Sequence, residues 1–288
     1  EKLDIQVLKH FNIKPNKINL NKWKRIVQSA NNVKSNINIG IVGKYTDLPD
    51  AYKSLNEAIV HGGLGNKLGV NIHWINSESL NNKSLDSKFS NINGIIVPGG
   101  FGERGISGKI KAINYARLNG VPFLGICLGL QLAVIEFSRN VLNIKSANSS
   151  EFVNTENNVI GLLKEWYRDG KKEIRSKSSD IGGSMRLGSY PCNILKGSLA
   201  YKIYNKITVH ERHRHRYEVN SIYEDKLKEK GMIFSGKSPD SMLPEIIEIT
   251  SHPWFVGVQF HPELKSRPFM PHPIFKSFIS AVKKVSKK

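Results

Sequence analysis

Apolar residues in the first half of the chain form short runs that alternate with longer amphipathic stretches. Each run has the length and apolar content of a buried strand, and each stretch repeats its apolar positions at helical spacing. The expected strands are INIGIVG (37–43), VNIHWI (70–75), NGIIVPGG (93–100) and VPFLGI (121–126). The expected helices are AYKSLNEAIVHGGL (51–64), GKIKAINYARLNG (108–120) and LGLQLAVIEFSRNVL (128–142). This order predicts an α/β fold with a mostly parallel central sheet flanked by helices.

The second half of the chain has more strands and fewer helices, and the N-terminus differs from both halves. The expected later elements are the strands MRLGSYPCNI (185–194), EIIEIT (245–250) and FVGVQF (255–260) and a closing helix, PHPIFKSFISAVKKV (271–285). Near the N-terminus, apolar residues from Leu20 to Ala30 are spaced as one face of a short helix over 19–33. We therefore expect a linker with a short helix over 1–36 and one compact domain over 37–288.

The charge balance, 43 Lys and Arg against 24 Asp and Glu, gives a formal net charge of +19. Such an excess raises the question of nucleic-acid binding. The lysines, however, are spread along the chain and interleaved with asparagines, as in LNNKSLDSKFSNING, rather than gathered on one helix or among stacking aromatics. We interpret most of this charge as solvated surface and expect no nucleic-acid partner.

Membrane and secretion signals are missing from the pattern. No apolar run approaches the roughly 20 residues needed to cross a bilayer, and the opening sequence EKLDIQVLKHFNIK lacks a signal-peptide core. The two cysteines, Cys127 and Cys192, are too few for a disulfide framework. These features predict a cytoplasmic protein with no membrane partner, in which one cysteine is a candidate nucleophile.

The sequence FLGICLGLQ (123–131) gives one cysteine a special setting. It contains the pattern G-x-C-x-G, formed by Gly125, Cys127 and Gly129, between an expected strand and an expected helix. A side chain on such a tight turn is thrust outward, and small neighbours are needed because the backbone is crowded. The helix N-terminus lowers a thiol pKa and presents the Leu128 amide to an oxyanion. Cys127 is therefore the candidate nucleophile.

A thiolate nucleophile needs a base, and VGVQFHPE (256–263) supplies His261 at the end of an expected strand. Glu263 points the same way on an extended chain and can fix the imidazole tautomer. A second oxyanion donor is expected from the glycine-rich loop PGGFGERG (98–105), where the amide of Gly100 is our candidate. A cysteine, a histidine and a glutamate together suit acyl transfer.

The motifs PGGFG, GICLGLQ and QFHPE resemble those of the class I glutamine amidotransferases. The similarity is greater to one group of that family, the glutaminase domains of CTP synthases, and covers essentially the whole chain. The stretches that carry it are VGKYTDLPDAYKSLNEAIVHGG (42–63), SANSSEF (146–152), GGSMRLG (182–188), ERHRHRYEVN (211–220) and HPWFVGVQFHPE (252–263). The resemblance implies a flavodoxin-like amidotransferase fold with a nucleophile elbow.

The same resemblance implies a catalytic triad and a set of substrate contacts. The triad is Cys127, His261 and Glu263, which agrees with the residues singled out by the motifs. An acidic group and a guanidinium suit the α-ammonium and α-carboxylate of L-glutamine. The resemblance assigns glutamine binding to Gly100, Leu128, Gly129, Leu130, Gln131, Glu151 and Arg216.

By resemblance, the domain has no cofactor of its own and passes ammonia to a synthetase domain of the same polypeptide, which is absent from this chain. That domain is expected to use Mg and ATP to aminate UTP to CTP in pyrimidine biosynthesis. GTP is the expected allosteric activator, and a homotetramer is the expected assembly of the full-length enzyme. Arg104, in the sequence GERG, is our candidate for a contact with GTP.

Two further patterns are interpreted as chance matches. GMIFSGKS (231–238) fits a P-loop expression, but its apolar MIF is expected to be a strand and Ser-Pro-Asp follows its lysine. His210, His213 and His215 offer imidazoles, but the arginines between them oppose a divalent cation. We therefore expect neither a P-loop nor a metal site.

The basic stretch HERHRHRYEVN (210–220) divides into two faces if it is extended. By the resemblance, Arg216 holds the substrate carboxylate, and we expect the other charges to serve domain contacts or the nucleotide effector. The expected faces are Arg212, Arg214 and Arg216 on one side and His213, His215, Tyr217 and Val219 on the other.

Two other functions stay open at this point. An inactive assembly or nucleic-acid-binding module predicts salt-sensitive binding to DNA or RNA that survives the loss of Cys127. A cysteine hydrolase of γ-glutamyl compounds on the same fold would prefer γ-glutamyl peptides to free glutamine.

Overall fold

The structure is a computed structural model, and it describes residues 2–33, 35–46, 48–153, 155–162, 165–168, 171–174 and 185–286. Two of the stretches that carry the resemblance are affected by the gaps. In GGSMRLG, residues 182–184 lie outside the described residues, and so does Asp47 in VGKYTDLPDAYKSLNEAIVHGG.

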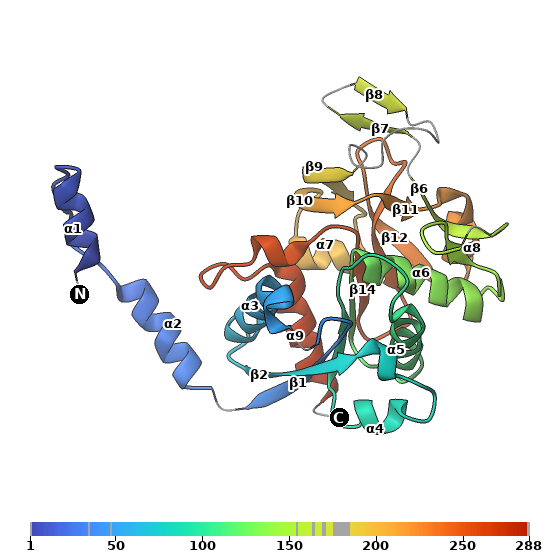
Figure 1. Cartoon of the computed structure of the whole chain (residues 1–288), viewed down its shortest axis with the longest axis horizontal. Coiled ribbons are helices and arrows are strands. Elements are labelled where there is room, and N and C mark those ends of the chain that lie inside the picture. The colour runs from blue at the N-terminus through green and yellow to red at the C-terminus, as the bar shows by residue number, and fades with distance from the viewer. Residues whose placement is uncertain are drawn as a thin grey trace.

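A nine-stranded sheet, counted over the described residues, forms the centre of the molecule (Figure 1). Its strands are β1 (Asn36–Gly43), β2 (Gly69–Asn76), β3 (Gly94–Val97), β4 (Phe123–Ile126), β9 (Arg186–Ile194), β10 (Thr208–His215), β12 (Met232–Lys237), β13 (Pro244–Ile249) and β14 (Phe255–Val258). Their order is β10-β9-β12-β13-β14-β4-β3-β1-β2. The part from β14 to β2 is parallel, and the part from β14 to β10 is antiparallel. The predicted α/β fold class is confirmed, and so is the strand nature of residues 232–237 inside the rejected P-loop match.

Helices cover both faces of this sheet (Figure 1). They are α1 (Leu3–His10), α2 (Asn21–Asn31), α3 (Lys53–Leu64), α4 (Leu85–Phe89), α5 (Ile106–Leu118), α6 (Leu128–Asn140), α7 (Leu199–Tyr204), α8 (Glu224–Glu229) and α9 (Pro273–Val285). Helices α3, α7 and α9 share one apolar core with residues such as Ile39 and Ile41. Helices α5 and α6 share the other core with residues such as Ile95 and Val97. Within the described ranges, no helix is both long and apolar enough to span a membrane.

Several short elements were not predicted. A three-stranded sheet joins β11 (Tyr217–Val219), β6 (Asn158–Leu162) and β5 (Asn148–Ser149), and β7 (Glu165–Arg168) pairs with β8 (Lys171–Ile174). Helices α1, α4, α7 and α8 were also missed. Each of these elements is eight residues or shorter, so its apolar positions are too few to show a period.

The predicted N-terminal helix is present as α2, preceded by the unpredicted α1. Both helices extend away from the sheet in Figure 1. Leu20, Trp23 and Val27 are each more than half exposed, so the apolar stripe of α2 is largely uncovered by this chain. The Trp23 ring does meet the Phe269 ring edge to face, with 4.5 Å between ring centroids.

The parallel strands place three loops side by side at one edge of the sheet. Strand β4 lies between β3 and β14 and pairs with both in parallel register. The residues that follow these strands are the PGGFG loop after β3, Cys127 after β4 and QFHPE after β14. Because the carboxyl ends of parallel strands meet at one edge, motifs far apart in sequence converge there.

Two glycines allow the turn at this edge to close. A Cβ on Gly129 would lie 2.0 Å from the carbonyl oxygen of Val97, which is backbone and cannot swing away. A Cβ on Gly125 would lie 2.7 Å from the carbonyl carbon and oxygen of Gly129. The strand-to-helix turn is therefore packed directly on the backbone of β3, as the G-x-C-x-G pattern predicts.

We predict that Gly129→Ala lowers the free energy of unfolding by about 3 kcal/mol, because the new methyl overlaps a fixed carbonyl. Urea unfolding followed by circular dichroism measures it. Gly161→Ala is the matched control, since a Cβ there meets no atom within 4 Å. Equal midpoints for Gly129→Ala and the unaltered chain would contradict this account of the turn.

Candidate active site

Cys127 occupies a strained turn between β4 and α6. Its φ of 53° and ψ of −104° lie outside the regions that a residue with a Cβ prefers. Its amide donates to the Val258 carbonyl at 2.7 Å, which ties the turn to the neighbouring strand. Helix α6 begins at the next residue, Leu128, whose N–H belongs to the first turn and has no partner within the helix. The turn thus combines a fixed sulfur with a donor beside it.

His261 and Glu263 lie beside this sulfur. The imidazole Nδ1 of His261 is 2.7 Å from Oε1 of Glu263. The extended chain expected to bring them together is wrong, because residues 262–265 form a 3-10 turn. Burial lowers the pKa of His261, but its interactions with the Cys127 sulfur and the Glu263 carboxylate outweigh burial and raise that pKa to about 11. The surroundings therefore favour the charged imidazolium of His261.

Gln259, which was not singled out from the sequence, also contacts the Cys127 sulfur. Its Nε2 donates toward Sγ at 3.8 Å, and its side chain is fully buried. The Nε2 of Gln131 donates to the Tyr217 carbonyl at 2.9 Å and to Oε1 of Gln259 at 3.3 Å. A polar residue inside the apolar strand-end motif VGVQF was the available signal. Because Cys127, Gln131 and Gln259 are all buried, this chain of contacts limits the movement of the sulfur.

The PGGFG loop closes over the same region. A Cβ on Gly99 would lie 2.9 Å from Cε1 of His261, so only a glycine fits there. The loop is held in place by Lys44, whose Nζ donates to the carbonyl of Phe101. Gly102 has a φ of 74° and donates its amide to Oε1 of Glu151 at 2.9 Å. The loop that carries Gly100 is thus fixed at several points.

A pocket of about 300 Å³ opens onto Cys127. It brings together the Gly100 loop, Cys127 and the His261–Glu263 pair. Its other wall, residues 50–55, was not singled out from the sequence, although this segment lies in one of the stretches that carry the resemblance. The lining residues are Asp50, Ala51, Tyr52, Lys53, Ser54, Leu55, Pro98, Gly99, Gly100, Phe101, Cys127, Arg214, His261, Glu263 and Leu264.

Glu151 and Arg216 do not line this pocket. Both lie close enough to Tyr217 to shift the pKa of its phenol. Burial raises the pKa of the Tyr217 phenol, Glu151 raises it further and Arg216 lowers it, so both charges lie near this ring. The Nε of Arg216 is buried and, among the described residues, has no hydrogen-bond acceptor. A buried guanidinium donor without an acceptor is costly, so this site suits an added anion.

The other predicted contacts lie within α6. Gly129 and Leu130 are in its first turn, buried beneath Cys127 and packed against β3 and β14. The side chain of Gln131 is occupied by the two hydrogen bonds described above. In this segment, it is the backbone at the turn that lies beside the Cys127 sulfur.

The two-face interpretation of the basic stretch is confirmed along β10 and fails beyond it. Burial alternates strictly from Thr208 to His215. At Arg216 the chain bends into β11, where Glu218 and Val219 are both buried, so the predicted alternation through Tyr217 is wrong there. The bend follows from pairing, because β10 pairs with β9 in the large sheet and β11 pairs with β6 in the small one.

The inward histidines of β10 belong to a buried polar network. Nδ1 of His213 is 2.8 Å from Nε2 of His215, and Nε2 of His213 is 3.2 Å from Glu245. Arg186 lies 2.5 Å from Glu245 and 3.4 Å from Glu218. Burial lowers the pKa of both histidines well below the usual value and raises that of Glu218 to about 8 and of Glu245 to about 7. The histidines are therefore neutral structural groups beneath the site.

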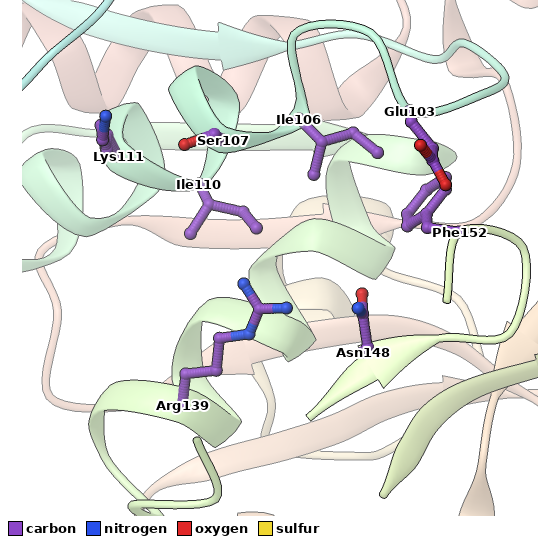
Figure 2. A pocket seen from close by; sticks show the side chains of 8 residues that line it. All are labelled: Glu103, Ile106, Ser107, Ile110, Lys111, Arg139, Asn148 and Phe152. Carbon is purple, nitrogen blue, oxygen red and sulfur yellow. The ribbon is translucent and has the colours of Figure 1, made fainter. Parts of the chain in front are cut away.

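Arg104 is not among the residues that line the Cys127 pocket, and a second pocket shares no lining residue with it. Arg104 is half exposed, 3.7 Å from Glu78, with its guanidinium 5.4 Å from the centroid of the Tyr45 ring. The second pocket, of about 310 Å³, lies between α5 and α6 (Figure 2). None of the triad residues lines it. Its lining includes Glu103, Arg139 and Phe152.

Cys192, the other cysteine, is unsuited to nucleophilic chemistry. It is fully buried in the core beside α7, and burial raises the pKa of its thiol far above the usual value. Of the two cysteines, Cys127 is therefore the one with polar side chains beside its sulfur.

Comparison with known proteins agrees with this geometry. Residues 47–281 match the family model described as "Glutamine amidotransferase class-I". The chain is 57% identical to a CTP synthase of Pelagibacter ubique (strain HTCC1062) over 284 residues, which cover 98% of this chain and 53% of that relative. It is 50% identical over 289 residues to a CTP synthase of Hyphomonas neptunium (strain ATCC 15444), covering 100% of this chain and 53% of that relative.

A solved structure gives the same result. A Trypanosoma brucei CTPS glutaminase domain with bound acivicin superposes with a TM-score of 0.77 and 37% identity, over 86% of this chain and 94% of that one. Its similarity therefore extends over most of the fold described above.

The chain belongs to the class I glutamine amidotransferase family. Within that family it belongs with the glutaminase domains of CTP synthase. The chain spans about half the length of the curated relatives it matches.

Proposed function

We propose that this chain hydrolyses L-glutamine to glutamate and ammonia through a γ-glutamyl thioester on Cys127. The observation that carries the proposal is the strained Cys127 turn, with the His261–Glu263 pair held at 2.7 Å beside it and a pocket open to the sulfur. This arrangement suits nucleophilic attack on an acyl carbon, because the sulfur is held in place by the turn and lies next to a proton carrier.

In the first half of the reaction, the Cys127 thiolate attacks the side-chain carboxamide carbon of glutamine. The carbonyl electron pair moves onto oxygen, and the amides of Leu128 and Gly100 stabilise that oxyanion. The carbon–nitrogen bond then breaks, His261 gives its proton to the departing nitrogen, and ammonia leaves. Glu263 keeps the imidazole oriented and stabilises its charged form.

In the second half, His261 takes a proton from water, and the resulting hydroxide attacks the thioester carbonyl. The same two amides stabilise the second oxyanion. Collapse breaks the carbon–sulfur bond, releases glutamate and returns the thiolate. Every bond change in these steps is a transfer of an acyl group or a proton, which are the transfers that a cysteine and a histidine perform.

The α-groups of glutamine would bind on the side where Glu151 and Arg216 flank Tyr217. Arg216 pairs with the α-carboxylate, using the buried Nε that lacks an acceptor among the described residues. Glu151 pairs with the α-ammonium while holding the Gly102 amide. The segment Leu128–Gln131, buried at the start of α6, would complete the glutamine contacts.

The ammonia would pass to a synthetase domain of the same polypeptide, as the length of the relatives suggests. There, UTP is aminated to CTP with ATP and Mg, and GTP activates the glutaminase, in a homotetramer. We assign Mg to that domain, where it would act with ATP in the amination. Arg104, beside Lys44 and Tyr45, is the residue we assign to the effector.

We predict that Cys127→Ala reduces ammonia release from L-glutamine by about 10⁴-fold or more, because no other group can form the thioester. The rate is measured by a coupled glutamate assay. Cys192→Ala is the matched control and should keep the activity, since Cys192 is buried in the core. Full activity in Cys127→Ala would refute the mechanism, and faster cleavage of γ-glutamyl peptides would make the chain a γ-glutamyl hydrolase.

We also predict that Arg216→Met raises the KM for L-glutamine by about 10- to 100-fold, the size of a charged hydrogen-bonded pair. The kcat should change much less, because the α-carboxylate carries the same charge in the transition state. Steady-state kinetics measure both. Arg25→Met, which removes a guanidinium from the exposed helix α2, is the control. An unchanged KM in Arg216→Met would remove this residue from the substrate site.

A further inference from the structure

A lysine is buried directly behind the Gly100 loop, and the mechanism above does not use it. Lys109 lies in the first turn of α5, and its side chain is 1% exposed. Its Nζ is 3.7 Å from the position that a Cβ on Gly100 would take. The same position is 3.5 Å from the Leu128 side chain. The ammonium therefore lies close to Gly100, which carries one of the proposed oxyanion donors, and Gly100 in turn lies against the side chain of Leu128.

The charges around Lys109 leave it short of a negative partner. Among the described residues, no carboxylate forms an ion pair with it. Burial, together with the cations Lys44 and Arg104, lowers its pKa to about 8, although the Cys127 sulfur acts to raise that pKa. Lys44 faces it from the end of β1, Arg104 from the loop before α5 and Cys127 from the start of α6. The anion that favours the charged lysine is thus the nucleophile itself.

A buried ammonium without a counterion is costly unless a negative charge forms nearby. Negative charge does form here during the proposed reaction, first on the sulfur and then on the oxyanion. We propose that Lys109 is a positioning residue of the oxyanion hole, whose positive charge holds the Gly100 loop toward the thiolate and stabilises the charge that moves from sulfur to oxygen. This inference rests on the proposed glutaminase function.

The inference has a defined pH signature. Lys109 carries its charge below a pKa of about 8 and loses it as the pH rises through that value. His261, whose pKa is raised to about 11, keeps its proton over the same range. A fall in kcat on the alkaline side near pH 8 therefore reports Lys109 and not His261.

The first experiment compares the pH dependence of kcat and KM in the unaltered chain, Lys109→Met and Lys111→Met. Lys111 lies two positions along the same helix, donates to the Leu80 carbonyl at 3.5 Å and lines the separate pocket in Figure 2. Lys109→Met should lower kcat about tenfold, leave KM within about twofold and remove the alkaline fall. Lys111→Met should keep the profile of the unaltered chain.

The second experiment does not depend on glutamine turnover. The rate of alkylation of Cys127 by iodoacetamide, measured by peptide mass spectrometry at several pH values, gives the midpoint of thiolate formation. Lys109→Met should raise this midpoint by about one pH unit, because a nearby cation is lost. A shifted midpoint in a chain that does not hydrolyse glutamine would reject the glutaminase proposal while supporting the coupling of Lys109 to Cys127.

Two results would overturn the inference. One is a folded Lys109→Met variant, as judged by its thermal melt, that keeps both the alkaline fall and the Cys127 midpoint. The other is an unaltered chain with no fall in kcat near pH 8. If Lys109→Met does not fold, Lys109→Arg decides the matter. The guanidinium introduced by Lys109→Arg stays charged to higher pH than an ammonium, so the alkaline fall in kcat must move to higher pH. A fall that stays at the pH found for the unaltered chain contradicts the proposed role of Lys109.

Discussion

The crowded turn at Cys127 is the constraint on which the rest of this structure depends. Gly129 approaches the Val97 carbonyl so closely that the turn cannot be separated from β3, and the Cys127 amide is bonded to β14. Cys127 is therefore fixed to the two strands whose loops carry Gly100, the proposed oxyanion donor, and His261, the proposed base. The strain stored in its φ of 53° is tolerated because these contacts determine the backbone from both sides.

Strand β10 also holds His261, the proposed base, in place. Its carbonyl at Arg212 accepts the His261 amide at 2.7 Å, and its carbonyl at Arg214 lies 3.9 Å from the Cys127 sulfur. The inward side chains of the same strand are fixed by the network around Arg186. Strand β10, whose basic sequence first indicates an anion-binding surface, thus also supports the backbone between Cys127 and His261.

Much of the fold and the centre of the site could be predicted from the sequence. Apolar runs located most strands of the large sheet, because buried parallel strands are apolar throughout. Strand β10 has no such run and was expected only from the alternation of its basic stretch. The backbone around Cys127 is so crowded that glycines are required there, and the G-x-C-x-G motif could therefore be recognised in the sequence. The contact of His261 with Glu263 was predicted correctly, but through an extended chain, since a turn beginning at Pro262 leaves no periodic signal.

Other features depend on tertiary contacts that no local pattern encodes. Gln259 looks like one polar residue in an apolar strand, and Lys109 looks like one of many helical lysines; only the fold shows that both are buried near the sulfur. The bend at Arg216 arises because the chain moves from one sheet to another there. Alternation within a strand cannot anticipate such a change of partner.

The central claim is that Cys127 is the nucleophile toward glutamine. Labelling with 6-diazo-5-oxo-norleucine, a glutamine mimic that alkylates its target, followed by peptide mass spectrometry, tests it most directly. The account predicts a single adduct on Cys127, whose formation is slowed by excess L-glutamine. An adduct on Cys192, or no adduct in a chain that still releases glutamate, would contradict it.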